Sequence, residues 1–290
     1  MSIETLLARQ NSDGGWPYLR GGSWTEPTVY ATLALLGAGQ HDAAARGVDW
    51  IVSRVRSDGG WAPCAGVDNS TWVTGLVALL PPDQLGAARS EAAIQWLLHT
   101  TGEESALTYR LREFLKGNSL PPEQRFEGWP WVPGTAAWVG PTSIAILALQ
   151  QAVRRNPSAA LTERIASGQQ FLLARMCKEG GWNHGSVRPL GYEGRPYPET
   201  TGMALAALGG AKAPELDRGL AVARQFLAEC RSADACNWLT LGLRAHGQAP
   251  RSANPPRVTY RTTPETALGM VVNSGEDKLF LAARAPGDRP

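Results

Sequence analysis

Apolar positions recur along the chain with the spacing of α-helices, and the helices that they predict are of two kinds. The first kind is apolar on one face only, as in residues 43–55 and 161–176, which indicates an outer helix that packs on a core. The second kind is apolar on most sides and rich in Ala, Gly, Ser and Thr, which allow close helix approach. Its members are residues 28–37, 71–80, 142–153 and 200–208, with 236–246 and 264–272 as two further candidates.

A short turn with Gly and Trp separates the two kinds of helix four times. It explains an unusual composition, with 11 Trp and 32 Gly in 290 residues. The glycines suit the left-handed residue that ends a helix. Trp16, Trp61 and Trp182 then pack back on the neighbouring helices. The four turns are residues 10–16, 57–61, 126–131 and 178–182.

Outer and inner helices in alternation, in about six pairs, predict an all-α fold: an (α/α)6 barrel, or toroid, formed by a single domain over residues 1–290. An open stack of helix pairs has the same alternation, so closure into a ring is an inference from the pattern. Residues 100–125 depart from the period, and residues 105–115 within them predict an extra helix.

Charge and cysteine content limit the classes of partner. The net charge is +2, from 28 Lys and Arg against 26 Asp and Glu, which gives no case for nucleic acid. No apolar run is long enough to span a bilayer, although peripheral membrane contact stays open. We expect no signal peptide, and four cysteines without a CxxC pair are typical of a reduced, cytoplasmic protein.

Acidic residues stand at the start of most inner helices. When the inner helices are aligned by their Ala and Leu pattern, Glu26, Glu199, Asp234 and Glu265 fall at one position, while Ser70 and Gly140 occupy it in the other two repeats. Parallel inner helices would place these acids around one mouth of the barrel. They are then either helix caps or a cluster that raises the pKa of one member until it holds a proton near neutral pH.

Aromatic residues accompany these acids. Trp24, Trp72, Trp138 and Tyr30 are predicted to line a central cavity, with ordinary core packing as the alternative. The long segment 182–197 contains His184 and Tyr197, and a loop of this length is typical of a functional lid, with an ordinary surface role as the alternative for His184. A protonated acid that faces aromatic rings suits acid catalysis through cationic intermediates.

One turn carries a family resemblance. Gln10, Asp13, Gly14, Gly15 and Trp16 form a QxxDGGW motif, which resembles that of the terpene cyclase/mutase repeat family. This family includes squalene–hopene cyclases and is related to the β subunits of protein prenyltransferases. The resemblance implies one (α/α)6 barrel with an apolar cavity, in which an acid starts the cyclisation of an isoprenoid substrate without a cofactor.

The resemblance also suggests which residues act. The family's DxDD motif is absent, and Asp68 stands nearest to its place, so Asp68 is the first candidate for the catalytic acid, followed by Glu199 and Glu26. Two alternatives stay open: a non-catalytic toroid that binds a lipid or peptide, and a prenyltransferase-like zinc site at Asp234 and Cys236. No metal site is assigned. The predicted substrate-binding residues are Trp24, Tyr30, Trp72, Trp138, His184, Tyr197, Asp234 and Glu265.

Overall fold

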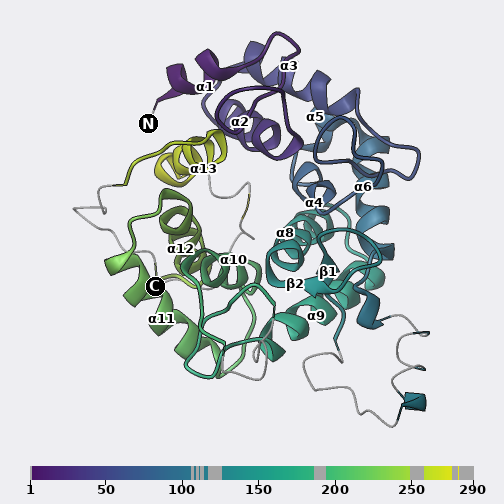
Figure 1. The fold of residues 1–290 in the computed structure, drawn as a ribbon, viewed down its shortest axis with the longest axis vertical. Coiled ribbons are helices and arrows are strands. Elements are labelled where there is room, and N and C mark those ends of the chain that lie inside the picture. The colour runs from purple at the N-terminus through teal and green to yellow at the C-terminus, as the bar shows by residue number, and fades with distance from the viewer. Residues whose placement is uncertain are drawn as a thin grey trace.

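A computed structural model describes residues 2–105, 108, 111, 114–116, 126–185, 194–248, 258–275 and 280. In these ranges the helices form two concentric layers around one axis (Figure 1). The outer layer contains α1 (Ile3–Arg9), α3 (His41–Val52), α6 (Ala87–His99), α9 (Ala159–Ala174) and α11 (Leu216–Glu229). The inner layer contains α2 (Thr25–Gly37), α4 (Val73–Val77), α8 (Val139–Arg155), α10 (Pro198–Ala207), α12 (Ala233–Ala245) and α13 (Thr263–Ser274).

Short elements connect the layers. They are α5 (Pro82–Leu85), the 3₁₀ turn η1 (Glu103–Ser105), and the antiparallel pair β1 (Trp129–Pro130) and β2 (Ala137–Trp138). In this pair Trp129 lies opposite Trp138, and a single bridge joins Trp16 to Trp24 in the same way. The helix predicted at residues 105–115 lies largely outside the described residues.

The inner helices run parallel and close a ring. The Gln150 side chain of α8 donates to the Ala207 carbonyl of α10 at 3.0 Å. Between the last two inner helices, the Arg244 side chain of α12 donates to the Val272 carbonyl of α13 at 2.6 Å. The last inner helix, α13, packs against the first, α2 (Figure 1). The predicted (α/α)6 barrel is therefore confirmed as the fold, whereas the extent of the domain, residues 1–290, stays a prediction.

Four buried tryptophans repeat one set of hydrogen bonds. In each turn the Trp indole N–H donates to a carbonyl near the end of the preceding outer helix, and the Trp backbone N–H donates to a threonine hydroxyl on the following inner helix. For Trp16 these acceptors are Leu6 and Thr28, at 2.8 and 2.9 Å. The other three sets are Trp61 with Ile51 and Thr74, Trp129 with Leu97 and Thr142, and Trp182 with Leu172 and Thr201.

The rest of the QxxDGGW motif clamps one helix pair to the next. The Gln10 amide donates to the carbonyls of Gly14 and Ala43, both at 2.9 Å. Asp13 accepts from the Trp50 indole at 2.8 Å. Gly14 has φ of +91°, and a Cβ there would lie 2.6 Å from the Arg46 carbonyl oxygen. The motif is thus required by close packing of the turn after α1 against α3, and this role is structural.

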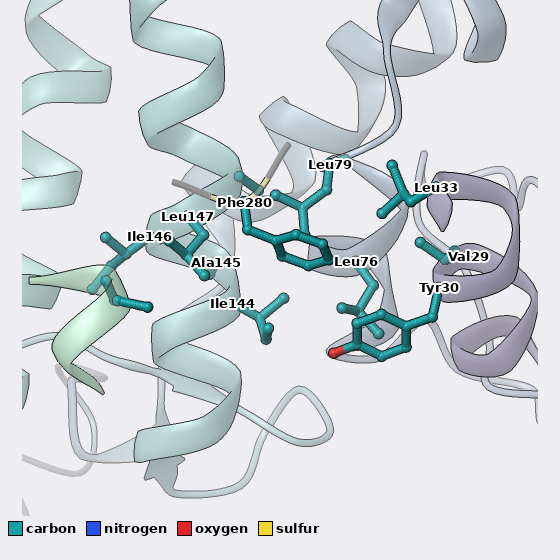
Figure 2. Packing of buried hydrophobic residues seen from close by; sticks show 14 of the residues in the cluster. Val29, Tyr30, Leu33, Leu76, Leu79, Ile144, Ala145, Ile146, Leu147 and Phe280 are labelled. Carbon is teal, nitrogen blue, oxygen red and sulfur yellow. The ribbon is translucent and has the colours of Figure 1, made fainter. Parts of the chain in front are cut away.

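Side chains fill the middle of the ring. Phe280 is 1% exposed and lies between inner helices (Figure 2). Its ring stacks on Tyr30 with centroids 6.0 Å apart and meets Trp238 edge-on at the same distance. The predicted Trp-lined central cavity is therefore occupied at this level. Among the residues that the structure describes, no helix is both long and apolar enough to cross a membrane.

Candidate active site at one mouth of the ring

Four carboxylates lie where the inner helices begin. Glu26, Glu199 and Asp234 stand in the first turns of α2, α10 and α12, and Glu265 stands in the first turn of α13. All four are partly buried. Because the inner helices run parallel, their N-termini meet at one mouth, and the helix dipoles there favour negative charge.

Asp234 is the most strongly affected of these groups. Burial raises its pKa, and the charges of Glu26, Glu199 and Glu265 raise it further, to about 7. Carboxylates from three other inner helices are thus close enough to act on one side chain. Asp234 can hold a proton at a pH where an ordinary aspartate is ionised, as an acid catalyst requires.

Glu26 differs from Asp234 because it has a hydrogen-bond donor. The Tyr18 hydroxyl donates to Glu26 Oε2. Burial raises the pKa of Glu26, and the bond from Tyr18 opposes this rise. Burial raises the pKa of the Tyr30 phenol, and the charges of Glu26 and Asp234 raise it further. Tyr30 therefore stays neutral beneath the acids.

Glu265 has a capping role as well. Its carboxylate accepts from the backbone N–H groups of Arg261 at 2.6 Å and Thr262 at 2.9 Å, and the Thr262 hydroxyl accepts from its own N–H at 3.3 Å. This reciprocal pair is a capping box. The two sequence-based interpretations of the acids thus apply to different members: Glu265 caps its helix, whereas Asp234 has the raised pKa.

Exposed aromatic rings surround the acids at the same mouth. Trp24, Trp138 and Tyr197 are the residues that directly precede α2, α8 and α10, and between 38% and 47% of their surface is exposed. Several rings pack in pairs: Tyr18 with Trp24 at 5.6 Å, Trp72 with Trp131 at 4.8 Å, and His184 with Tyr197 at 5.1 Å between centroids.

A buried ion pair supports the Trp138 side of the mouth. Arg175 and Glu104 lie 3.4 Å apart with less than a tenth of either side chain exposed. Glu104 accepts from the Ala137 N–H at 3.1 Å, and the Arg175 guanidinium donates to the Gly185 carbonyl. A Cβ at Gly185 would lie 3.0 Å from the Trp138 ring. The pair thus fixes Ala137, the residue before Trp138 in β2, and the backbone of Gly185 beside the Trp138 ring.

The predicted site residues do not all meet. Asp68, the first candidate for the acid, is exposed in the loop before α4, and it is not among the groups that raise the pKa of Asp234. Tyr30 is buried under the acids, next to Phe280. Residues 186–193 of the predicted loop lie outside the described residues. In each repeat a threonine accepts from the backbone N–H of the turn Trp, and Glu26 stands two residues before this threonine in the first repeat. By the same count, Trp72 rather than Ser70 takes the place of Glu26 in the second repeat.

Sequence reasoning missed Tyr18 and Trp131 as parts of the mouth. Tyr18 follows the first turn by two residues and carries no motif, so its bond to Glu26 had no sequence signal. The sequence pattern places Trp131 in the repeated turn together with Trp129, yet Trp129 is buried and Trp131 is 37% exposed. The departure of this turn from the GGW pattern was the available signal.

The zinc alternative does not fit the donor set. Among the described residues no group of three or more His, Cys, Asp and Glu side chains is placed to hold a metal ion. Burial and the neighbouring Cys230 raise the pKa of the Cys236 thiol to about 12, whereas zinc binds the thiolate. Glu265, a nearby carboxylate at the start of the last inner helix, is engaged in its capping box.

A concave region lies on the outer surface between α6 and α9, with a volume of about 820 Å³. Its lining includes Glu91, Glu163 and Arg164, and none of the predicted site residues contributes to it. It is therefore separate from the mouth.

No protein-family model and no curated protein matches this chain. Solved structures with TM-scores near 0.6 do share its fold. The endoglucanase Cel10 of Klebsiella pneumoniae, a family 8 glycosyl hydrolase, has a TM-score of 0.61 at 16% identity, with 95% of this chain and 99% of that chain covered. The endo-β-1,4-glucanase CMCax of Acetobacter xylinum has 0.60 at 13% identity, covering 95% and 97%. The family 76 mannosidase Bt3792 of Bacteroides thetaiotaomicron has 0.59 at 9% identity, covering 95% and 96%.

These similarities correct the family that the sequence suggested. The structurally similar proteins are glycoside hydrolases, so the predicted membership of the terpene cyclase/mutase family is wrong. Cyclisation of an isoprenoid, the apolar substrate, the lipid- or peptide-binding toroid and the prenyltransferase-like alternative are not supported either. The physical reason is that the QxxDGGW residues clamp helices rather than contact a substrate, and Phe280 occupies the interior where an apolar chain was expected.

Proposed function

We propose that this protein hydrolyses glycosidic bonds in a carbohydrate bound across the acid-bearing mouth of the ring. The observation that carries the proposal is Asp234, an acid with a pKa of about 7 beside the carboxylates of Glu26, Glu199 and Glu265. Hydrolysis of a glycoside needs one carboxylic acid that holds a proton and a second carboxylate that is ionised. The described residues offer both within one cluster.

In the proposed reaction Asp234 gives its proton to the glycosidic oxygen as the bond between that oxygen and the anomeric carbon breaks. A water molecule forms the new bond to that carbon, and its proton passes to the carboxylate of Glu26. Both groups return to their starting states by proton exchange with solvent. Glu199 contributes through its charge, which keeps the proton on Asp234.

The exposed rings would bind the sugar. One face of a pyranose carries several C–H groups, which pack well on an aromatic face, while its hydroxyls stay in water. Trp24, Trp138 and Tyr197 offer such faces at the starts of three inner helices, with Trp72 and His184 beside ring partners. This arrangement suits a polymer that lies along the mouth better than a small apolar molecule within the ring.

The test is whether the protein hydrolyses any member of a polysaccharide panel, measured by the release of reducing ends. Because the structural neighbours include endoglucanases and a mannosidase, the panel contains β-1,4-glucan, mannan and xylan. We expect Asp234→Asn and Glu26→Gln each to lower kcat on the order of 100-fold or more. Glu163→Gln, an exposed carboxylate on the outer helix α9, is the matched control and should keep full activity.

Two results would overturn the proposal: no turnover or binding of any glycan by the folded protein, or full activity in Asp234→Asn. The same assay tests the prediction that Asp68 is the catalytic acid, since Asp68→Asn would then be inactive. A cytoplasmic location also stays a prediction. It agrees with the four cysteines, Cys64, Cys177, Cys230 and Cys236, none of which forms a disulfide.

A further inference from the structure

Tyr18 lies at the junction of the first and last inner helices. Its ring packs edge-on against Trp24, at 5.6 Å between centroids and 62° between planes. Its backbone carbonyl accepts from the Thr263 N–H, at the start of α13, at 2.8 Å. Its hydroxyl donates to Glu26 Oε2. Tyr18 is thus held by Trp24, which precedes α2, and by Thr263 of α13. Its single O–H proton is directed at the carboxylate of Glu26.

The two acids at the centre of the mouth differ in this respect. Glu26 accepts from Tyr18, and a hydrogen bond to a carboxylate favours its ionised form. Among the described residues, nothing donates a hydrogen bond to the Asp234 side chain. The ionisable groups that face it are the carboxylates of Glu26, Glu199 and Glu265 and the phenol of Tyr30. At Glu26 the bond from Tyr18 thus opposes the rise in pKa that burial causes, whereas at Asp234 the neighbouring carboxylates add to that rise.

No other charged group of the described residues reverses this difference. The groups that face Glu26 are the phenols of Tyr18 and Tyr30, from the loop before α2 and from α2 itself, and Asp234 from α12. Burial raises the pKa of both phenols, and the charge of Glu26 raises it further, so both stay neutral near pH 7. Cys64 also faces Tyr18. None of these groups supplies a positive charge.

We propose that Tyr18 is a positioning residue whose hydroxyl holds Glu26 as the ionised base, so that the shared proton of the mouth resides on Asp234. The assignment of the two chemical roles rests on the proposed function, but the distribution of the proton does not. Without the phenol, the two acids would compete more equally for the proton, and fewer molecules would carry the base and the acid in their working forms.

The direct test is a titration of the side-chain carboxyl groups by NMR, without substrate, in Tyr18→Phe. Phenylalanine keeps the ring that packs on Trp24 and leaves the backbone bond from Thr263 intact. We expect the pKa of Glu26 to rise and that of Asp234 to fall. Difluorotyrosine at position 18, which has a more acidic hydroxyl and donates more strongly, should move the pKa of Glu26 in the opposite direction.

Tyr260→Phe is the matched control. Tyr260 lies near Glu265, and its phenol bonds to Asn273 rather than to an acid of the mouth. Its loss should leave the titration of Glu26 unchanged. If Tyr18→Phe also leaves that titration unchanged, the proposal is wrong, even if the variant is less active.

Kinetics then separate this proposal from the proposed reaction. On a glycan that is hydrolysed, Tyr18→Phe should lower kcat by roughly tenfold with little change in KM. The acidic limb of its pH profile should move to higher pH, because Glu26 must be ionised to act. If the titration changes as expected but no glycan is hydrolysed, the role of Tyr18 is supported and the glycosidase is not.

Discussion

The Gly-Trp turns and the starts of the inner helices differ in how uniform their residues are from one repeat to the next. At the Gly-Trp turn, Trp16, Trp61, Trp129 and Trp182 make the same two hydrogen bonds and are almost fully buried. Two residues before the threonine that accepts from this Trp, the chain carries Glu26, Trp72, Gly140 and Glu199 in turn. The turns are interchangeable because they all solve one packing problem. The helix starts differ because they face solvent and one another.

The largest expected effect separates the turns from the helix starts by stability. Trp16→Ala removes a fully buried ring and two hydrogen bonds, and should lower the free energy of unfolding by about 3–5 kcal/mol. Trp24→Ala removes a ring that is 38% exposed and makes no side-chain capping bond, so its cost should stay within about 1 kcal/mol. Urea denaturation measures both. An equal loss in the two variants would contradict the division between scaffold and mouth.

The next effect is a gain in stability that depends on pH. The pKa of Asp234 is about 7 in the folded protein, above the value of 3.8 for an ordinary aspartate. The folded state therefore holds the extra proton between these values, and its stability falls as pH rises through them. Asp234→Asn should stabilise the protein at pH 8.5 by about 2–4 kcal/mol, after allowance for partial exposure.

At pH 3 the same variant should have no advantage, because Asp234 is then protonated in both states. Asp49→Asn, on the exposed face of α3, is the control and should alter stability little at either pH. Thermal unfolding followed by circular dichroism at both pH values measures the difference. A variant of Asp234 that is destabilised at pH 8.5 would show that its carboxylate is held by attraction rather than repulsion.

The smallest effect tests one hydrogen bond of the turn. Thr28→Val keeps the shape of the side chain but leaves the buried N–H of Trp16 without its acceptor, at a cost of about 1–2 kcal/mol. Thr32, one turn along α2, is also buried, and its hydroxyl has no partner among the described residues. Thr32→Val should therefore be neutral or stabilising by urea denaturation, and a similar loss in both variants would remove the special role of the turn.

Much of the fold could be predicted from sequence because its determinants are local. The Gly-Trp turn and the apolar pattern of residues 28–37 and 142–153 lie within short windows, and they recur. Alternation of two helix types then restricts the architecture to a toroid or a stack. Closure itself depends on contacts such as Thr263 with Tyr18, which no short window contains.

The chemistry was less predictable, and the reason is again distance along the chain. Only its place relative to a motif of another family makes Asp68 a candidate, whereas the proton on Asp234 depends on carboxylates from three other helices. The motif that carries the resemblance encodes the contacts that hold the turn after α1 against α3. A sequence match there reports on packing, and any barrel that uses the same clamp would match equally well.

Ring closure has a consequence for synthesis. Arg9 donates to the Arg261 carbonyl, a bond between residues 252 positions apart, and Glu26 belongs to the first inner helix while Asp234 and Glu265 belong to the last two. During synthesis on the ribosome, Glu26 emerges early, but Asp234 and Glu265 emerge only when almost the whole ring has been translated. Contacts of such long range form late and slowly. The carboxylate cluster should therefore exist only in finished molecules, and a stalled chain would be a stack of helix pairs with no site.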